Sequence, residues 1–297
     1  MNDKKKFRCG FVAIIGAPNA GKSTLLNGIL GQKIAITSKK PQTTRNRILG
    51  ICNRPESQII FLDTPGIHKP SGLLNKKIVA MAVGAVKEVD LVIFMQDVSS
   101  KKDKDAEDMI IRQLLLEKKE VILVLNKIDL IKKTELLPMI EQSGSMFDFA
   151  TVVPVSAKKG IQVDKLLEET EKLLPPGPGL FPGDVFTDVS ERFLVQELIR
   201  EKIFRLTGME IPYSTAVTVD AFKLKKKIIH IHATIHVNRN SQKGIILGKK
   251  GAMIRKIGEK ARIDIEKMTG TKIFLELFVR VTKDWMRNER HLTEFGY

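Results

Sequence analysis

The sequence predicts a two-domain chain, in which an α/β domain with a mostly parallel, helix-flanked sheet precedes a smaller α+β domain. Short apolar segments alternate with longer amphipathic ones through the first 175 residues, as is typical of parallel strands joined by helices. Four prolines and three glycines then fall within residues 175–183, a composition that neither a helix nor a central strand tolerates. We therefore expect domains at 1–175 and 184–297, joined by a linker at 176–183.

Apolar periodicity places the elements of both domains. Buried strands of the first domain are expected at Phe11–Ile15, Gln58–Leu62, Leu91–Gln96, Val121–Leu125 and Thr151–Val155. Helical patterns lie between most of them, as at Lys22–Leu30 and Ala106–Lys118. The second domain is expected to run helix 188–206, strands Tyr213–Leu224 and Ile228–Val237, helices Gln242–Leu247 and Ala252–Met268, and strand Lys272–Thr282.

Composition narrows the class of protein. An apolar fraction of 43% and a charged fraction of 28% are ordinary for a soluble globular chain, and no apolar run approaches the roughly 18 residues that span a bilayer. The apolar stretch after the N-terminal lysines is too short for a signal peptide. Cys9 and Cys52 lie far apart, so we expect two free thiols in a reducing, cytoplasmic setting.

The charge balance points to a polyanionic partner. Fifty basic residues against 34 acidic ones give a formal net charge of +16, and residues 221–262 contain 12 basic residues and one acidic residue, Glu259. A field of one sign on this scale attracts polyanions. RNA, DNA and an anionic membrane surface all satisfy this observation alone.

A phosphate-binding motif follows the first expected strand. Residues 16–23 read Gly-Ala-Pro-Asn-Ala-Gly-Lys-Ser, which matches G-x-x-x-x-G-K-[ST] between a strand and a helix. The glycines let the backbone wrap a phosphate at a helix N-terminus. Lys22 is expected to reach the β- and γ-phosphates and Ser23 to bind Mg²⁺. The alternative is a glycine turn that carries a lysine by chance.

Three further motifs each end an expected strand. Asp63-Thr-Pro-Gly66 offers a carboxylate for Mg²⁺ and a glycine amide for the γ-phosphate. Asp129, in Asn126-Lys-Ile-Asp129, can accept hydrogen bonds from N1–H and the 2-amino group of guanine, which adenine lacks. The Ala157 amide in Ser156-Ala-Lys158 can contact the guanine oxygen. Ligands in such sheets bind beyond the carboxyl ends of the strands.

These four motifs, in this order, resemble the G motifs of translation-factor-class GTPases. The resemblance implies a threonine that closes over Mg²⁺ and the γ-phosphate. Pro41-Gln-Thr-Thr44-Arg45 fits that place, and we expect Thr44 rather than a merely solvated loop threonine. The expected catalytic residues are Lys22, Thr44, Asp63 and Gly66, and the expected metal ligands are Ser23, Thr44 and Asp63. The expected GTP contacts are Gly16, Ala17, Pro18, Asn19, Ala20, Gly21, Lys22, Ser23, Thr24, Asp63, Thr64, Pro65, Gly66, Asn126, Lys127, Asp129, Ser156, Ala157 and Lys158.

The position after Gly66 departs from Ras-like proteins. Ile67 stands where those proteins carry a glutamine, and an isoleucine cannot orient a water molecule. Hydrolysis then depends on another group, a partner or a cation. Relatives with G-x-P-N-x-G-K-S often recruit K⁺ at the asparagine, here Asn19, although a loop asparagine that makes only local hydrogen bonds is an equal alternative.

The second domain carries its own glycine motif. Gly248-Lys249-Lys250-Gly251 lies between two expected helices, and the order helix, strand, strand, helix, G-x-x-G, helix, strand resembles a KH domain of the prokaryotic type (type II). That resemblance implies a loop that clamps single-stranded RNA, with Lys243, Arg255 and Lys256 nearby. The alternative is a helical turn with a solvated basic face. His230, His232 and His236 are expected on the polar face of a half-buried strand rather than as metal ligands.

Taken over nearly its whole length, the chain resembles the Era family of GTPases. Pro41-Gln-Thr-Thr-Arg45 and Gln242-Lys-Gly-Ile-Ile-Leu-Gly248 carry the resemblance beyond the G motifs. It implies a cytoplasmic, Mg²⁺-dependent, monomeric GTPase that binds 16S ribosomal RNA near its single-stranded 3′ end and assists assembly of the small (30S) subunit. Two alternatives stay open: an RNA-binding module with GTP as a structural ligand, and a GTPase peripheral to the inner face of a membrane.

Overall fold

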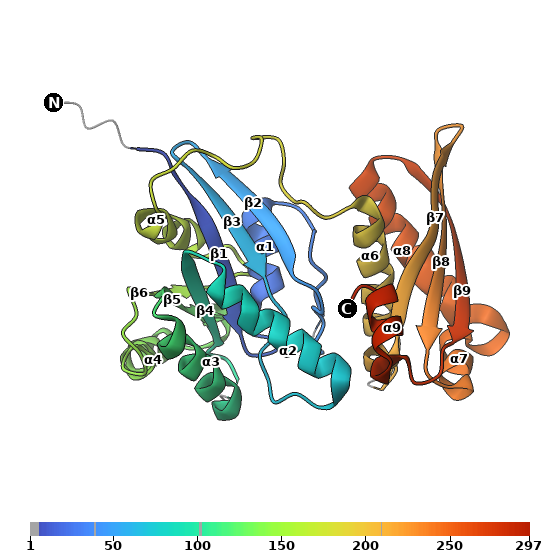
Figure 1. Cartoon of the computed structure of the whole chain (residues 1–297), viewed down its shortest axis with the longest axis horizontal. Coiled ribbons are helices and arrows are strands. Elements are labelled where there is room, and N and C mark those ends of the chain that lie inside the picture. The colour runs from blue at the N-terminus through green and yellow to red at the C-terminus, as the bar shows by residue number, and fades with distance from the viewer. Residues whose placement is uncertain (1–5, 39, 101–102, 209) are drawn as a thin grey trace. The chain divides into compact units, whose positions relative to one another are not determined.

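Residues 6–38, 40–100, 103–208 and 210–297 are described by the computed structural model of the chain (Figure 1). They form two compact units. The first unit contains Met1–Ala35, Thr44–Pro70 and Lys76–Asp188, and the second contains Ile36–Thr43, Ser71–Asn75 and Val189–Tyr297. Two short segments therefore pack with the second unit although the sequence on either side of them belongs to the first.

A six-stranded sheet in the order β2-β3-β1-β4-β5-β6 forms the centre of the first unit. Neighbouring strands are parallel except for β2, which runs antiparallel to β3. The five expected strands are present, and β2 is an edge strand that the periodicity did not predict. The strands are β1 (Arg8–Gly16), β2 (Ile48–Arg54), β3 (Ser57–Asp63), β4 (Leu91–Asp97), β5 (Glu120–Asn126) and β6 (Thr151–Val155).

Helices cover both faces of this sheet, as expected for right-handed crossovers between parallel strands. Apolar side chains of α2 and α3, among them Val86 and Ile110, pack with Phe94 and Leu123 in one buried cluster. Helices α1 and α5 lie against the opposite face (Figure 1). The helices are α1 (Lys22–Leu30), α2 (Gly72–Lys87), α3 (Lys104–Glu117), α4 (Lys133–Gly144) and α5 (Val163–Leu173), with a 3₁₀ turn at Ile128–Leu130.

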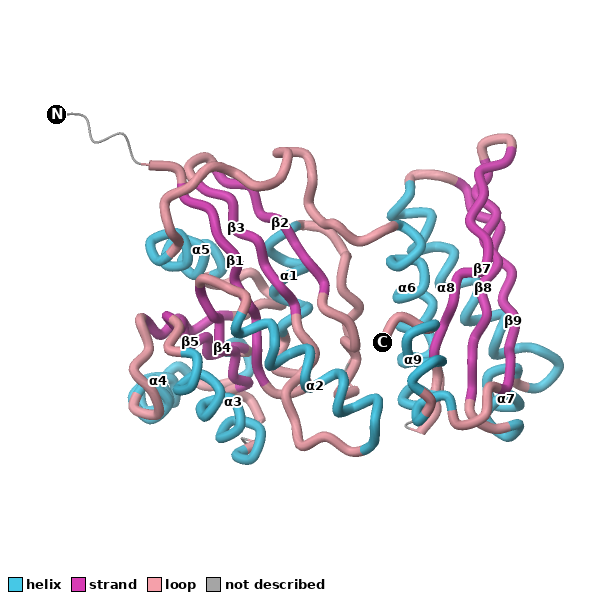
Figure 2. The backbone as a smooth tube through the Cα atoms, viewed as in Figure 1, coloured by secondary structure: helices cyan, strands magenta, loops and turns pink. Residues whose placement is uncertain are grey.

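The second unit contains the three-stranded sheet β7-β8-β9, in which β8 runs antiparallel to β7 and parallel to β9. Helices α6 and α8 pack side by side on one face of it (Figure 2). The strands are β7 (Ala216–Lys225), β8 (Ile228–Val237) and β9 (Lys272–Val281), and the helices are α6 (Glu191–Leu206), α7 (Asn240–Leu247), α8 (Ala252–Thr269) and α9 (Glu289–Glu294), with 3₁₀ turns at Pro212–Ser214, Lys249–Gly251 and Trp285–Arg287.

Alternation along β8 builds the core of this unit. Ile229, Ile231, Ala233, Ile235 and Val237 are all buried on the face that the helices cover, as the alternation predicted. Helix α6 starts after Ser190, whose hydroxyl accepts a hydrogen bond from the Phe193 amide at 3.3 Å. The helix therefore begins after Ser190 and not at 188 as the sequence predicted, because the Ser190 side chain reaches the free amide and caps it.

The histidines of β8 do not share one environment. His230 and His232 are partly exposed, as expected for the polar face of the strand. His236 is buried instead, with its ring centroid 4.2 Å from that of Phe295. The segment that follows β9 covers it, held by Trp285, whose Nε1 donates to the Ser214 carbonyl at 3.1 Å.

The described part of the chain bears on three expectations from the sequence, which concern metal-binding clusters, membrane-spanning helices and free thiols. No group of three or more His, Cys, Asp or Glu side chains there could hold a metal ion. None of the helices described is both long enough and apolar enough to cross a bilayer. Cys9 and Cys52 are free and buried, in agreement with the expectation of unpaired thiols.

Burial of His236 predicts a pH-dependent loss of stability. Burial lowers the pKa of His236 from 6.5 to about 4, so the unfolded chain binds a proton at a pH where the folded chain does not. Its contribution to stability is complete above pH 6.5 and is lost as the pH falls toward 4. Between about pH 7 and about pH 5, the melting temperature should fall further in the parent than in His236→Asn. Equal falls, measured by circular dichroism, would contradict this account.

Candidate functional site

The carboxyl ends of the parallel strands gather the predicted nucleotide-binding motifs at one edge of the sheet. Strand β1 ends at Gly16, β3 at Asp63, β5 at Asn126 and β6 at Val155. Because these strands run in one direction, the loops that follow them emerge on the same side. Residues that lie more than a hundred positions apart in the sequence are therefore brought together.

Three glycines of these loops are required by close contacts. A Cβ on Gly16 would lie 2.3 Å from the Met95 carbonyl oxygen, and one on Gly21 would lie 2.3 Å from the Asn126 side-chain nitrogen. Gly21 also has a φ of 102°, which disfavours other residues. A Cβ on Gly66 would lie 2.8 Å from the backbone of Pro18. Only glycine lets the phosphate loop and its neighbours approach so closely.

Lys22 holds a positive charge inside the phosphate loop. Its side chain is buried, and Nζ donates to the carbonyls of Gly16 at 3.1 Å and Ala17 at 3.0 Å. Burial lowers the pKa of Lys22 to about 8, while attraction to Asp63 acts in the opposite direction. Helix α1 begins at this residue, so its free amides and dipole add to the attraction for an anion.

Ser23, Thr44 and Asp63 form an oxygen cluster beside Lys22. The Ser23 hydroxyl donates to Asp63 Oδ2 at 2.6 Å and lies 2.9 Å from the Thr44 hydroxyl. Asp63 is fully buried, and its Oδ1 has no hydrogen-bond partner among the described residues. Burial raises the pKa of Asp63 to about 6. A hard cation such as Mg²⁺ would use these oxygens and favour the ionised carboxylate, so the residues fit the metal.

Asn126 connects three of the motifs. Its Nδ2 donates to the Ala20 carbonyl at 2.7 Å, and its Oδ1 accepts from the Ala157 amide at 3.0 Å. The Ser156 hydroxyl donates to Asp129 Oδ1 at 2.6 Å, and this bond is the first cause that lowers the pKa of Asp129. Asp129 is therefore a carboxylate at neutral pH, able to accept the two donors of guanine.

Asp97, at the end of β4, belongs to the same edge and was missed by the sequence analysis. Its Oδ2 accepts from Lys127 Nζ at 2.5 Å, and its Oδ1 accepts from the Ser99 hydroxyl at 2.7 Å. Lys127 has a left-handed φ of 71°, so this ion pair holds a conformation that lysine rarely adopts. One feature of the sequence could have identified Asp97, namely its position: it is the last residue of its strand, as Asp63 and Asn126 are the last residues of theirs.

The other predicted contacts surround this edge. Thr64 is buried and donates to the Ile14 carbonyl at 2.9 Å. Asn19 stands exposed at the tip of the phosphate loop with a φ of 65°. Ile67 packs in the apolar core while its amide donates to the Gly16 carbonyl at 3.1 Å, so its side chain has no part in orienting water. The remaining predicted contacts are the buried Pro65, the partly buried Thr24 and the exposed Lys158.

The G-x-x-G loop of the second unit presents open backbone and two lysines. A Cβ on Gly248 would lie 2.8 Å from Met253, whereas nothing lies within 4 Å of a Cβ on Gly251. Lys249 and Lys250 are exposed, and Lys250 has a left-handed φ of 51°. The loop therefore turns tightly on one side and leaves its other side accessible.

Helix α8 begins directly after this loop. The Ala252 amide donates to the Lys249 carbonyl, and the N-cap, Gly251, has no side chain to accept the amides that follow, which leaves those donors for an anion such as a phosphate. Arg255 and Lys256 are exposed in the same part of α8, and Lys243 of α7 is partly exposed. The basic residues predicted to contact RNA thus flank one open loop.

Comparisons with known proteins extend over the whole chain. A family model described as a 50S ribosome-binding GTPase matches residues 11–127, and a KH domain model matches residues 210–286. GTPase Era from Geobacter metallireducens is 55% identical over 293 residues, 98% of each chain. GTPase Era from Geobacter sp. (strain M21) is 54% identical over 295 residues, 99% of each chain.

Two solved structures share the fold at 40% identity, covering 98% of this chain and 99% of theirs. A variant of Aquifex aeolicus Era bound to GDP·AlF4⁻ superposes with a TM-score of 0.94. Era in complex with MgGDPNP and nucleotides 1506–1542 of 16S ribosomal RNA superposes with a TM-score of 0.95.

Guanine selectivity should depend on Asp129. Asp129→Asn replaces an acceptor by a donor, so GTP affinity should fall by about 100-fold or more, because a site built for hydrogen bonds rejects a mismatched pattern. Xanthosine triphosphate, with a carbonyl in place of the 2-amino group, should bind the variant better than GTP. Calorimetric titration of both nucleotides checks this, and equal GTP affinity in variant and parent would refute the assignment.

Phosphate handling should depend on Lys22. Lys22→Ala should reduce GTP hydrolysis by about 100-fold or more, because it removes the charge that meets the γ-phosphate, while circular dichroism stays native. Lys104→Ala, an exposed lysine at the start of another helix, is the matched control and should hydrolyse at the parental rate. Parental activity in Lys22→Ala would exclude this use of the loop.

Proposed function

Because the chain belongs to the Era family of GTPases, we propose that it is a GTP-hydrolysing switch that binds 16S ribosomal RNA and assists assembly of the small ribosomal subunit. The observation that carries the proposal is the presence of two sites on one chain: a guanine-nucleotide edge and a basic G-x-x-G loop. A solved relative with 40% identity holds MgGDPNP and a 16S fragment together, which supports joint use of the two sites.

Residues 1–175 hydrolyse GTP and residues 184–297 bind RNA, with 176–183 as the linker. Lys22 binds the β- and γ-phosphates, and the Gly66 amide meets the γ-phosphate. Ser23, Thr44 and Asp63 hold Mg²⁺, which supplies positive charge between the phosphates. Asp129 selects guanine, and the Ala157 amide shares its N–H between Asn126 Oδ1 and the guanine oxygen in a three-centre bond.

The RNA half is proposed to clamp the single-stranded 3′ region of 16S RNA. Open amides at the start of α8 and the side chains of Lys249 and Lys250 meet the sugar–phosphate chain. Lys243, Arg255 and Lys256 add positive charge along the flanking helices. We further propose that the protein acts as a cytoplasmic monomer. An anionic membrane face is the alternative partner for this basic surface. Lipid binding requires positive charge alone, so it gives no reason for a loop that clamps nucleotides.

Hydrolysis is proposed to use K⁺ at Asn19, since Ile67 is buried in the core and no glutamine follows Gly66. Turnover should then be faster in K⁺ than in Na⁺ at equal ionic strength, by about tenfold, because a correctly sized cation at this position adds charge to the transition state. Asn19→Ala should remove the difference between the two salts. Equal rates for the parent in both salts would exclude Asn19 from the mechanism.

Nucleotide and RNA binding should be coupled. The γ-phosphate and Mg²⁺ order the loops at Ile36–Arg47 and Gly66–Leu74, so RNA affinity should rise by about tenfold between GDP and GDPNP, and RNA should raise GDPNP affinity by the same factor. Fluorescence anisotropy of a labelled 3′ fragment at one fixed salt concentration measures this. Identical RNA affinity in both states would reduce the protein to two independent modules.

The same assay tests the clamp. Lys249→Asp with Lys250→Asp should abolish RNA binding, because two anions would face the phosphates, while GTP binding stays intact. Lys226→Asp with Lys227→Asp makes the same charge change at an exposed turn of the same unit and should weaken RNA binding far less. Equal effects of the two double variants would mean that general charge, and not the G-x-x-G loop, binds the RNA.

A further inference from the structure

Helix α6 buries an unusual number of charged side chains. Glu197, Arg200, Glu201 and Lys202 are each less than a tenth exposed. Its apolar residues already supply the core of the second unit, so these charges are not needed for that packing. A buried charge is costly unless it is paired and hydrogen-bonded. Their partners therefore indicate what the helix does besides filling the core.

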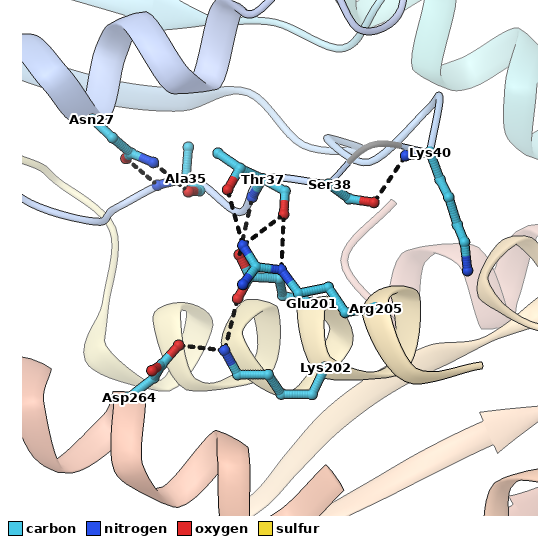
Figure 3. Close-up of polar contacts among 9 residues, drawn as sticks. All are labelled: Asn27, Ala35, Thr37, Ser38, Lys40, Glu201, Lys202, Arg205 and Asp264. Carbon is cyan, nitrogen blue, oxygen red and sulfur yellow. Dashed lines mark hydrogen bonds and ion pairs between the residues drawn. The ribbon is translucent and has the colours of Figure 1, made fainter. Parts of the chain in front are cut away.

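One set of partners lies at the start of the segment Ile36–Thr43, which packs with the second unit (Figure 3). Glu201 Oε1 accepts from the Thr37 amide at 3.2 Å. Arg205 donates to the Thr37 carbonyl at 3.2 Å and to its hydroxyl at 3.3 Å. The two side chains also pair with each other at 3.0 Å, so backbone donor and acceptor of Thr37 are both held by one ion pair.

A second contact lies in the middle of the segment. Lys40 Nζ donates to the carbonyls of Phe204 and Thr207, each at 2.6 Å. These carbonyls lie at the C-terminal end of α6, where helical acceptors lack partners and the dipole attracts a cation. Lys40 therefore serves as a cap for α6 that comes from a distant part of the sequence.

A third contact lies at the end of the segment. Arg200 donates to the Thr43 carbonyl at 2.5 Å, while Glu197 holds the same guanidinium through two bonds of 2.7 and 2.6 Å. Lys202 supports the first contact in the same way, because it pairs with Glu201 at 2.8 Å and with Asp264 of α8. The side chains that grip the segment are thus themselves fixed by neighbours, which limits their freedom to rearrange.

We propose that α6 holds in place the loop that carries Thr44. Arg205 and Lys40 are positioning residues in this contact, and they set the ratio of the protein's affinity for a nucleoside triphosphate to its affinity for a diphosphate. Thr44 follows the anchored Thr43 directly in the chain, and its hydroxyl lies 2.9 Å from that of Ser23. The inference rests on the proposed role of Thr44 toward Mg²⁺ and the γ-phosphate. A diphosphate has no γ-phosphate, so only triphosphate binding depends on where this loop is held.

Affinities for GDPNP and GDP, both with Mg²⁺, test the proposal on the full chain. Arg205→Ala and Lys40→Ala should each lower GDPNP affinity by about five- to tenfold and leave GDP affinity within about twofold of the parent. Both side chains are partly exposed, so their truncation leaves the core intact, and unchanged apo melting verifies this. Arg192→Ala, at an exposed arginine in the first turn of α6, is the matched control and should leave both affinities unchanged.

Thr44→Ala separates the proposal from the function on which it rests. Thr44→Ala alone should lower GDPNP affinity, and adding Arg205→Ala to it should cause little further loss, because Arg205 acts through Thr44. Two results would overturn the role of α6 and leave the role of Thr44 intact. One is equal weakening of GDPNP and GDP binding, and the other is a parental ratio of GDPNP affinity to GDP affinity in both Arg205→Ala and Lys40→Ala. An unchanged ratio in Thr44→Ala would overturn both and locate the failure at Thr44.

Discussion

The nucleotide edge depends on how closely the phosphate loop approaches the end of β5. Asn126 bonds to the Ala20 carbonyl and the Ala157 amide, and Gly21 leaves room for it where any Cβ would lie 2.3 Å from its nitrogen. One side chain therefore ties the phosphate loop to the loop that carries Ala157, while the Asp129 carboxylate is held by the neighbouring Ser156. The geometry explains why residues from three loops can act on a single nucleotide.

Burial of two charged side chains determines the electrostatics of the same edge. Lys22 and Asp63 are both buried, and the low local dielectric opposes charge on each, which lowers one pKa and raises the other. Bringing a polyphosphate and a metal ion to these residues supplies the counter-charges that burial withholds. We propose that this site, electrostatically incomplete without its ligand, binds that ligand strongly and distinguishes three phosphates from two.

Helix α6 belongs to the second unit and contacts the segment that leads to Thr44. The helix contributes Ile203 and Ile199 to the core beneath the KH-like sheet, and its buried charges hold the segment that leads to Thr44. The element that organises the proposed RNA half therefore also holds the segment next to Thr44. A switch needs a group whose equilibrium both ligands bias, and we propose that this loop is that group.

Much of this could be predicted from the sequence, because the nucleotide motifs are local. Gly16–Ser23 and the strand that precedes it specify a phosphate loop with no reference to the rest of the chain, and the alternation at Ile228–Val237 fixed which face of β8 is buried. Features that depend on tertiary contacts were not predictable. Strand β2 is an antiparallel edge strand with no motif, and Asp97 is recognisable only through its pairing with Lys127.

The same limit applies to burial and to caps. His236 reads as the polar face of a strand, because nothing in β8 shows that Phe295 will cover it. Nor does the sequence near α6 show that Lys40, more than 160 residues away, bonds to its last carbonyls. Periodicity describes what a segment can bury, whereas the partner that buries it is decided by the fold.

Crosslinking the protein to total cellular RNA in its GDPNP and GDP states, followed by sequencing, tests whether the chain binds its RNA under the control of its nucleotide. We expect crosslinks concentrated near the 3′ end of 16S ribosomal RNA in the GDPNP state and strongly depleted in the GDP state. Crosslinks spread over many RNAs, with the same distribution in both states, would contradict the account.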